Sequence, residues 1–235
     1  MINVIGLGYI GLPTALMLAS HGHQVVGTDI NKKLVEQLNQ KTLTFEENGL
    51  STIFEKALDQ NIQFKEDVVT ADIYILAVPT PYLYVTKRID TTYVMQAIND
   101  VLKKAPKESI IVIESTISPG TIDKFIKPEI KKQGIKLGED IHLVHAPERI
   151  IPGNMIHELK YNSRTIGVDS LDIGNQVKAV YESFCQGEIV LTDIRSAEMS
   201  KVIENTFRDV NIAFANELAK ICRSDNMDVY EIIRI

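Results

Sequence analysis

Residues 1–20, MINVIGLGYIGLPTALMLAS, contain no charged side chain and set the pattern that the rest of the chain follows. The run INVIG (2–6) has the β-branched character of a short strand, and GLPTALMLASHG (11–22) suits a buried helix. Between them, GLGYIG (6–11) matches G-x-G-x-x-G. The stretch therefore predicts a strand, a tight turn and a helix.

The same apolar stretch could instead direct export or cross a membrane. A signal peptide has a basic segment near its start, whereas the first Lys or Arg here is Lys32. Gly6, Gly8, Gly11 and Pro13 would weaken a membrane helix that has no flanking charge to anchor it. We therefore expect neither export nor contact with a membrane.

The glycine turn has the spacing of a dinucleotide-binding site. Gly6 would permit the turn, Gly8 would let the backbone approach a pyrophosphate, and Gly11 would let the helix pack closely on the strand. The phosphates would rest on the helix N-terminus, where free N–H groups favour an anion. Tyr9 and Ile10 belong to the same turn and are counted with the cofactor-binding residues. Such turns also occur for structural reasons, so the context matters.

Asp29 supplies that context. It ends a second strand, QVVGTD (24–29), and follows Gly11 by eighteen residues. An acidic group there can hydrogen-bond the ribose hydroxyls and repels a 2′-phosphate, so NAD is favoured over NADP. The alternative is that Asp29 is a turn or N-cap residue before INKKLVEQLNQ (30–40).

Composition narrows the possible classes. The 235 residues are 45% hydrophobic and 24% charged, which is ordinary for a globular protein. A net charge of −6 argues against nucleic acid as a partner. Cys185 and Cys222 stand far apart without ligand-like spacing, so we expect free structural thiols, no metal site and a reducing, cytoplasmic location.

Strand and helix patterns alternate after residue 70. Buried strands are predicted over 72–78 and 109–116, helices over 91–105 and 119–134, and later strands over 140–149, 164–169 and 188–193. This alternation predicts an α/β fold with a doubly wound, mostly parallel Rossmann-type sheet over residues 1–194.

A long helix is predicted to begin near Arg195, and we assign residues 195–235 to a central helical segment. Residues 196–226 contain no Pro or Gly, a run longer than most helices of globular domains. The apolar side chains that could cover a core or a partner chain are Val202, Thr206, Val210, Ala213, Ala215, Leu218 and Ile221. Polar residues are dispersed around the same helix, so part of it is expected to line a site.

These motifs together resemble the UDP-glucose/GDP-mannose dehydrogenase family of nucleotide-sugar 6-dehydrogenases. GLGYIGLP (6–13), AVPTP (77–81), ESTISPGT (114–121), HAPERIIPGN (145–154) and SAEMSKVIENTFRDVNIAFANELA (196–219) occur in the family's order and spacing. PERIIPGN and NTFRDVNIAFANE are similar to the branch that oxidises N-acetylhexosamines, with UDP-N-acetyl-D-mannosamine as the substrate implied first. UDP-glucose is the alternative sugar.

The resemblance implies oxidation of the sugar C6 alcohol to a carboxylate with two NAD molecules, through a cysteine thioester, for polysaccharide biosynthesis. Lys201 and Asn205, one helical turn apart, would hold the reacting oxygen and a water. Glu148 would activate water, and Thr116 would contact water or nicotinamide. The remaining implied contacts are Thr80 for the cofactor and Arg149, Arg208 and Asn211 for the UDP-sugar.

Composition alone also allows purely structural roles for the same residues. Lys201 could pair with Glu204 or Asn205 on a solvated helix face, and Glu148 with Arg149 could form a surface ion pair. Thr116 is a typical strand residue, and Thr80 could merely shape a turn.

The resemblance does not decide whether this sequence contains every part of the family's enzyme. The family's nucleophilic cysteine follows later in the chain than DVYEIIRI (228–235), so we expect it and a UDP-binding domain to lie outside this sequence. The alternatives are a non-catalytic NAD-binding or dimerisation module and dehydrogenases of 6-phosphogluconate or 3-hydroxyacyl-CoA, in which PERIIPGN is not expected. A homodimer through the central helix is the expected assembly.

Overall fold

The structure, a computed structural model, describes residues 1–60, 62–85, 87–150 and 153–235. Its main feature is one eight-stranded sheet. In spatial order the strands are β10 (Ile189–Thr192), β9 (Arg164–Val168), β8 (Ile141–His145), β7 (Ser109–Ile113), β4 (Ile73–Leu76), β1 (Ile2–Ile5), β2 (Val25–Thr28) and β3 (Gln63–Lys65). Neighbouring strands are parallel except β8 and β9, which are antiparallel, so the predicted mostly parallel sheet is confirmed.

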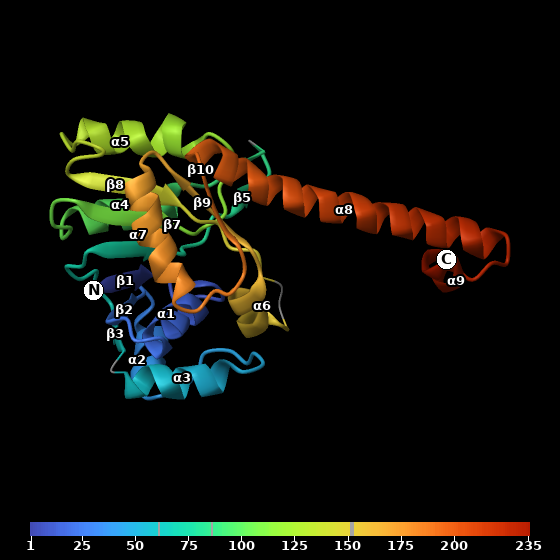
Figure 1. Cartoon of the computed structure of the whole chain (residues 1–235), viewed down its shortest axis with the longest axis horizontal. Coiled ribbons are helices and arrows are strands. Elements are labelled where there is room, and N and C mark those ends of the chain that lie inside the picture. Colours follow the sequence, from blue (N-terminus) through green and yellow to red (C-terminus); the bar gives the residue numbers. More distant parts are fainter. Residues whose placement is uncertain (61, 86, 151–152) are drawn as a thin grey trace.

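Helices cover both faces of the sheet, as a doubly wound fold requires (Figure 1). The helices that contribute to the core on one face are α1 (Gly11–Ser20), α2 (Lys32–Asn39), α3 (Leu50–Asp59), α6 (Met155–Tyr161) and α7 (Leu171–Glu182). The opposite face carries α4 (Thr92–Leu102), the π-helical turn η1 (Ile122–Ile126), α5 (Lys127–Lys132) and the first residue of α8.

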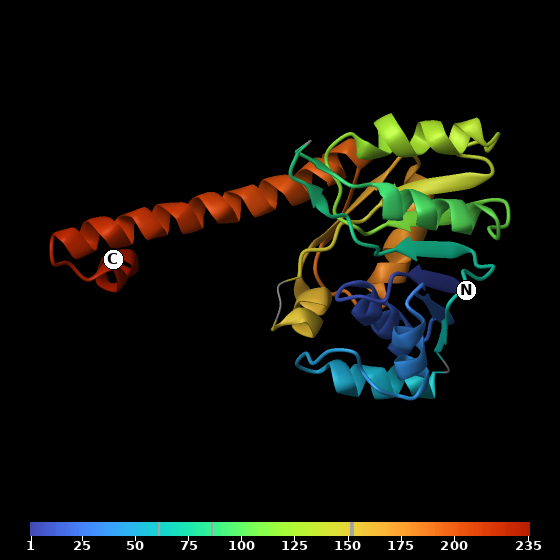
Figure 2. The same ribbon diagram turned by 180° about the vertical axis from the view of Figure 1, so that it is seen from behind.

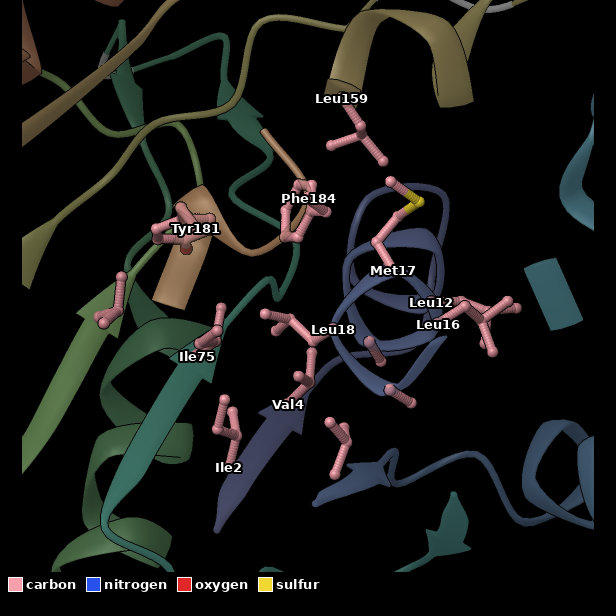
Figure 3. Close-up of a cluster of buried hydrophobic side chains, with 14 of the residues drawn as sticks. Ile2, Val4, Leu12, Leu16, Met17, Leu18, Ile75, Leu159, Tyr181 and Phe184 are labelled. Atoms are coloured by element: carbon pink, nitrogen blue, oxygen red, sulfur yellow. The ribbon is translucent and has the colours of Figure 1, made fainter. Parts of the chain in front are cut away.

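Helix α1 is buried on almost every side, which explains its lack of charged residues. Residues 11–19 are all buried beneath α3, α6 and α7 and against the sheet. Figure 3 shows Leu18 of α1 pointing toward Val4 and Ile75 of the neighbouring strands. Burying each such leucine side chain contributes on the order of 2 kcal/mol to the stability of the fold. The apolar opening stretch is therefore core.

The order of the strands creates a crevice beside β1. The chain passes from β1 to β2 and β3 on one side, then crosses to β4, β7 and β8 on the other. At such a switch point the connections diverge, and ligands bind outside the carboxyl ends of the strands. The segments 6–11, 77–80, 114–116 and 146–150 follow β1, β4, β7 and β8, so they come to this same edge.

Helix α8 (Ile194–Ser224) projects from the α/β body, and the short α9 (Val229–Arg234) folds back at its far end (Figures 1 and 2). The Asp193 carboxylate caps α8 by accepting a hydrogen bond from the Ser196 N–H at 2.9 Å. The predicted long helix is thus confirmed. A small antiparallel hairpin, β5 (Tyr82–Leu83) and β6 (Arg88–Ile89), lies in the loop after β4.

Most apolar side chains along α8 do not cover a core of this chain, so of the two expected roles, a core or a partner chain, only the partner chain stays a prediction. Only Ile194, Ala197, Glu198, Lys201 and Cys222 are buried in this helix. The large apolar side chains that α8 leaves exposed are Met199, Ile203, Phe207, Val210, Ile212, Phe214 and Ile221. Throughout the described ranges, none of the helices is both long and apolar enough to cross a membrane.

Candidate active site

The glycine turn joins β1 to α1 through two very close backbone contacts. Gly6 has a φ of +90°, and a Cβ there would lie 2.7 Å from the Ala77 carbonyl oxygen. A Cβ on Gly11 would lie 1.8 Å from the Gly6 oxygen, so any side chain would separate the helix from the strand. Gly8, by contrast, is exposed, and a Cβ there would meet nothing within 4 Å. The fold thus explains Gly6 and Gly11 but leaves the space beside Gly8 open.

Asp29 lies directly beside this turn. One carboxylate oxygen accepts a hydrogen bond from the Leu7 N–H at 2.8 Å, and the other accepts one from the Asn31 N–H at 2.8 Å. Asn31, not Asp29, is the N-cap of α2. A carboxylate has about four lone-pair sites, so Asp29 can still accept from ribose hydroxyls while it holds the turn. Its structural and binding roles are therefore compatible.

A cavity of about 310 Å³ opens at the carboxyl edge of the sheet. Its walls come from the glycine turn, the ends of β4, β7 and β8, and the lower part of α8. The lining residues are Ile10, Ala77, Glu114, Ser115, Thr116, Glu148, Ile150, Lys201, Asn205 and Arg208. The structure thus brings together six residues that the sequence had singled out, although they are scattered over some 200 positions.

Glu148 is a buried carboxyl group on the cavity wall. Its side chain is not in a surface ion pair with Arg149, so that alternative is wrong: Arg149 Nε lies 2.9 Å from a Glu204 carboxylate oxygen instead. Burial raises the pKa of Glu148 to about 7, although the nearby Arg164 charge and the Ile150 backbone favour its ionised form. A carboxyl group with this pKa can both accept and donate a proton near neutral pH.

Lys201 faces the same cavity from α8. It is 8% exposed, so its placement on a solvated helix face is wrong. Burial lowers the pKa of this lysine, and the charges of Glu148 and Glu204 partly offset that effect. A partly desolvated ammonium group near Glu148 can stabilise negative charge on a reacting oxygen.

The position of Lys201 depends on Glu198, which lies one helical turn earlier and is almost completely buried. The Glu198 carboxylate accepts hydrogen bonds from the backbone N–H groups of Gly120 and Ile122, the latter at 2.9 Å. These contacts attach the base of α8 to the loop that follows Thr116. The helix is therefore anchored next to the cavity even though most of its length is solvent-exposed.

A buried polar network beneath the cavity was not identified from the sequence. Glu114 pairs with Arg164 at 2.8 Å and also accepts hydrogen bonds from the Tyr181 hydroxyl and, on its other oxygen, from Thr14. The Arg164 guanidinium also lies over the Tyr181 ring, 4.2 Å from its centroid. A charged residue directly after the apolar strand 109–113 was the available signal for Glu114, whereas its partners come from distant elements.

Other predicted residues lie around the cavity and not in its wall. Thr80 donates a hydrogen bond to the Thr116 carbonyl at 2.7 Å and so joins two loops at the sheet edge. Arg149 donates to Thr165 Oγ1 in addition to pairing with Glu204. The exposed Asn211 side chain donates to the Phe207 carbonyl of its own helix. Residues 151–152 of the PERIIPGN motif lie outside the described residues.

Both cysteines are buried away from the lining residues of the cavity. Cys185 precedes β10, and Cys222 lies near the end of α8. Within the described part of the chain, neither thiol belongs to the cavity wall. The structure therefore agrees with structural thiols at these two positions.

We expect the buried carboxyl of Glu148 to make stability depend on pH. Because its pKa in the folded chain is about 7 and its ordinary value is 4.5, the folded chain binds more protons between these values. The free energy of unfolding should therefore fall as pH rises through this window, by on the order of 3 kcal/mol from this group. Urea unfolding at about pH 5 and about pH 8 should show that Glu148→Gln gains stability relative to wild type at the higher pH.

The exposed Glu55 supplies the control for this measurement. Glu55→Gln should keep the same stability difference from wild type at both pH values, because its carboxyl lies in solvent on α3. A Glu148→Gln difference that is equally independent of pH would contradict the assigned pKa.

Comparison with known proteins identifies the fold with a particular family. Residues 1–185 match the NAD binding domain of the UDP-glucose/GDP-mannose dehydrogenase family, and residues 195–235 match its central domain. The chain is 44% identical over its whole length to a UDP-N-acetyl-D-mannosamine dehydrogenase of Methanococcus maripaludis, of which it covers 54%.

Solved structures agree with this match. The UDP-N-acetyl-mannosamine dehydrogenase of Staphylococcus aureus is 44% identical and superposes with a TM-score of 0.88 over 99% of this chain and 57% of its own. The UDP-N-acetylmannosamine dehydrogenase of Pyrococcus horikoshii is 38% identical, with a TM-score of 0.92 over 100% of this chain and 57% of its own. The chain spans about half the length of these relatives. It belongs to the UDP-glucose/GDP-mannose dehydrogenase family and carries that family's NAD-binding domain.

Proposed function

We propose that this chain is the cofactor-binding and central-helix part of an NAD-dependent 6-dehydrogenase that converts UDP-N-acetyl-D-mannosamine to UDP-N-acetyl-D-mannosaminuronate. The observation that carries the proposal is the cavity in which the buried Glu148 and Lys201 lie beside the glycine turn. The similarity to dehydrogenases named for this sugar supports the choice of substrate. These relatives are about twice as long as this chain, so the activity is proposed for a protein of their length.

The residues present fit NAD. Helix α1 has no side-chain cap and no acidic residue in its first turn, within the part of the chain that the structure describes. Its N-terminus therefore favours a pyrophosphate, and the open space at Gly8 admits one. Asp29 would bind the adenosine ribose and disfavour a 2′-phosphate. When bound, NAD supplies the acceptor for the hydride that leaves C6.

Two groups in the cavity suit the first oxidation. The C6 hydroxyl must lose a proton as its hydride leaves, and the oxygen gains negative charge during that step. Lys201 and Asn205 lie one turn apart on α8 and both line the cavity, so they can hold this oxygen and an ordered water. Thr116, at the end of the β7 segment, can contact the same water or the nicotinamide.

The second oxidation requires a thiol, and within the described residues neither Cys185 nor Cys222 lines the cavity. The sulfur of such a thiol would add to the C6 aldehyde to give a thiohemiacetal, a second NAD would supply the acceptor for its hydride, and a thioester would remain. Water then displaces the thiol and leaves the carboxylate. Glu148 fits the role of base for that water, because a carboxyl with a pKa of about 7 is partly ionised at neutral pH.

The first test is cofactor binding. Calorimetric titration of this chain should show NAD binding more tightly than NADP, because Asp29 repels the 2′-phosphate. Gly8→Val should abolish binding while the chain stays folded, since a Cβ there would meet no protein atom within 4 Å and would enter the space proposed for the pyrophosphate. Equal affinity for the two cofactors would contradict the role of Asp29.

We also propose that α8 mediates homodimerisation. The apolar residues exposed along it form a surface of the kind that proteins usually cover, and they occupy successive turns of one helix. Sedimentation at on the order of tens of micromolar protein should therefore find a dimer. A monomer at this concentration would contradict the proposal, and Phe207→Glu should produce that monomer if α8 is the interface.

The decisive test of the function is turnover by chains of two lengths. We expect the 235 residues to bind NAD without oxidising UDP-N-acetyl-D-mannosamine, because neither buried cysteine lines the cavity of the described residues. A protein of the relatives' full length should form on the order of two NADH per sugar, and UDP-glucose serves as the competing substrate. Sustained turnover by the short chain would overturn this division of roles.

A further inference from the structure

Glu47 joins two segments that are far apart in the sequence. It lies in the loop between α2 and α3, and one of its carboxylate oxygens accepts a hydrogen bond from the Tyr9 hydroxyl at 2.6 Å and another from the Gly153 N–H at 3.0 Å. Its other oxygen accepts one from the Met155 N–H at 3.4 Å. One carboxylate thus connects the glycine turn with the start of α6.

The rest of the loop touches the same two segments. The Phe45 ring packs on the Tyr9 ring with 5.1 Å between centroids. On the other side, Gly49 lies near the Ile156 side chain of α6, because a Cβ built on this glycine would come within 3.9 Å of it. Residues 45–49 therefore form a bracket between the turn and α6, with Glu47 as its polar link.

The pKa shifts of Glu47 and Tyr9 favour the hydrogen bond between them. The hydrogen bond from Tyr9 lowers the pKa of Glu47, and the Gly153 and Met155 backbone groups lower it further. The same hydrogen bond raises the pKa of Tyr9, so its hydroxyl remains a donor at neutral pH. Hydrogen bonds to an ionised acceptor are shorter and stronger than those between neutral groups.

The two linked segments carry different parts of the site. Tyr9 lies between Gly8 and Gly11, where the cofactor phosphates are proposed to bind. Gly153 lies three residues after Ile150, and Ile150 lines the cavity together with Glu148. The contacts of Glu47 therefore fix the separation between the cofactor turn and the start of α6.

We propose that Glu47 is a positioning residue that holds the glycine turn and the start of α6 (153–155) in one fixed arrangement, so that cofactor affinity depends on a side chain that does not touch the cofactor. The inference rests on the proposed cofactor site, but it requires no turnover. Tyr9 then acts through its hydroxyl on Glu47, while its backbone forms part of the turn. A preorganised turn loses less conformational entropy when it binds its ligand.

The matched variants are Glu47→Gln, Tyr9→Phe and Glu46→Gln. Glu47→Gln keeps the shape of the side chain but removes its charge and replaces one acceptor oxygen with a donor. Tyr9→Phe removes only the hydroxyl. Glu46 is the adjacent, exposed carboxylate and serves as the control.

Calorimetry with NAD should show Glu47→Gln and Tyr9→Phe each weakening binding about tenfold, with Glu46→Gln unchanged. Because both groups act through one contact, the double variant should bind no more weakly than the weaker single variant. Additive losses, or unchanged NAD affinity in Glu47→Gln, would overturn the proposal.

Amide hydrogen exchange of the cofactor-free chain gives an independent readout. Glu47→Gln should accelerate exchange both in residues 7–11 and in residues 153–155, whereas Glu46→Gln should change neither. Faster exchange in residues 45–49 alone would contradict the proposal that Glu47 holds the glycine turn and the start of α6 together. If the wild-type chain bound no NAD, the proposed function would fail and exchange alone would decide whether Glu47 holds the two segments together.

Discussion

The close approach of Gly11 to the Gly6 carbonyl is the contact on which the rest of the structure depends. It lets α1 begin directly against β1, so the helix can bury nearly all its side chains between the sheet and its neighbours. The same geometry points the N-terminus of α1 at the carboxyl edge of the sheet. Because parallel strands end at a common edge, the segments after β4, β7 and β8 meet this helix end, and the cavity forms there.

The cavity concentrates charged groups that an apolar interior would otherwise exclude. Glu114 and Arg164 form a buried pair that Tyr181 and Thr14 complete with hydrogen bonds, which offsets the cost of removing both charges from water. Glu148 lies near the same arginine without a comparable partner, so burial dominates its pKa. Glu114 thus has a direct ion pair, whereas Glu148 has only more distant cations, Arg164 and Lys201, to offset its burial.

The N-terminal part of helix α8 is attached to the α/β body, whereas most of the rest of the helix is exposed. Glu198 fixes the base through backbone N–H groups near Gly120, and this contact places Lys201 and Asn205 at the cavity. Beyond Arg208 the helix makes few contacts with the α/β body (Figures 1 and 2). The hydrogen bonds of Glu47 join the glycine turn to the start of α6. Glu198 and Glu47 thus both link distant segments by accepting backbone hydrogen bonds.

The sequence by itself determined the elements whose signals are local. The strand, glycine turn and helix over residues 1–20, the alternation that predicts a parallel sheet and the long helix after Arg195 all follow from periodicity, glycine spacing and the absence of helix breakers. The family motifs also singled out Glu148 and Lys201. Composition could not distinguish these two residues from surface ion pairs, because burial is a property of the folded chain.

Only the tertiary structure decided what surrounds each of these residues. Arg164 and Tyr181 lie 50 and 67 positions from Glu114, and Gly153 lies 106 positions from Glu47, so no local pattern relates them. The apolar residues of α8 also show the limit of periodicity, which identifies an amphipathic helix but not whether its apolar side meets this chain's core. Packing between distant elements sets the burial and the hydrogen-bond partners of each carboxyl group, and burial is what raises the pKa of Glu148.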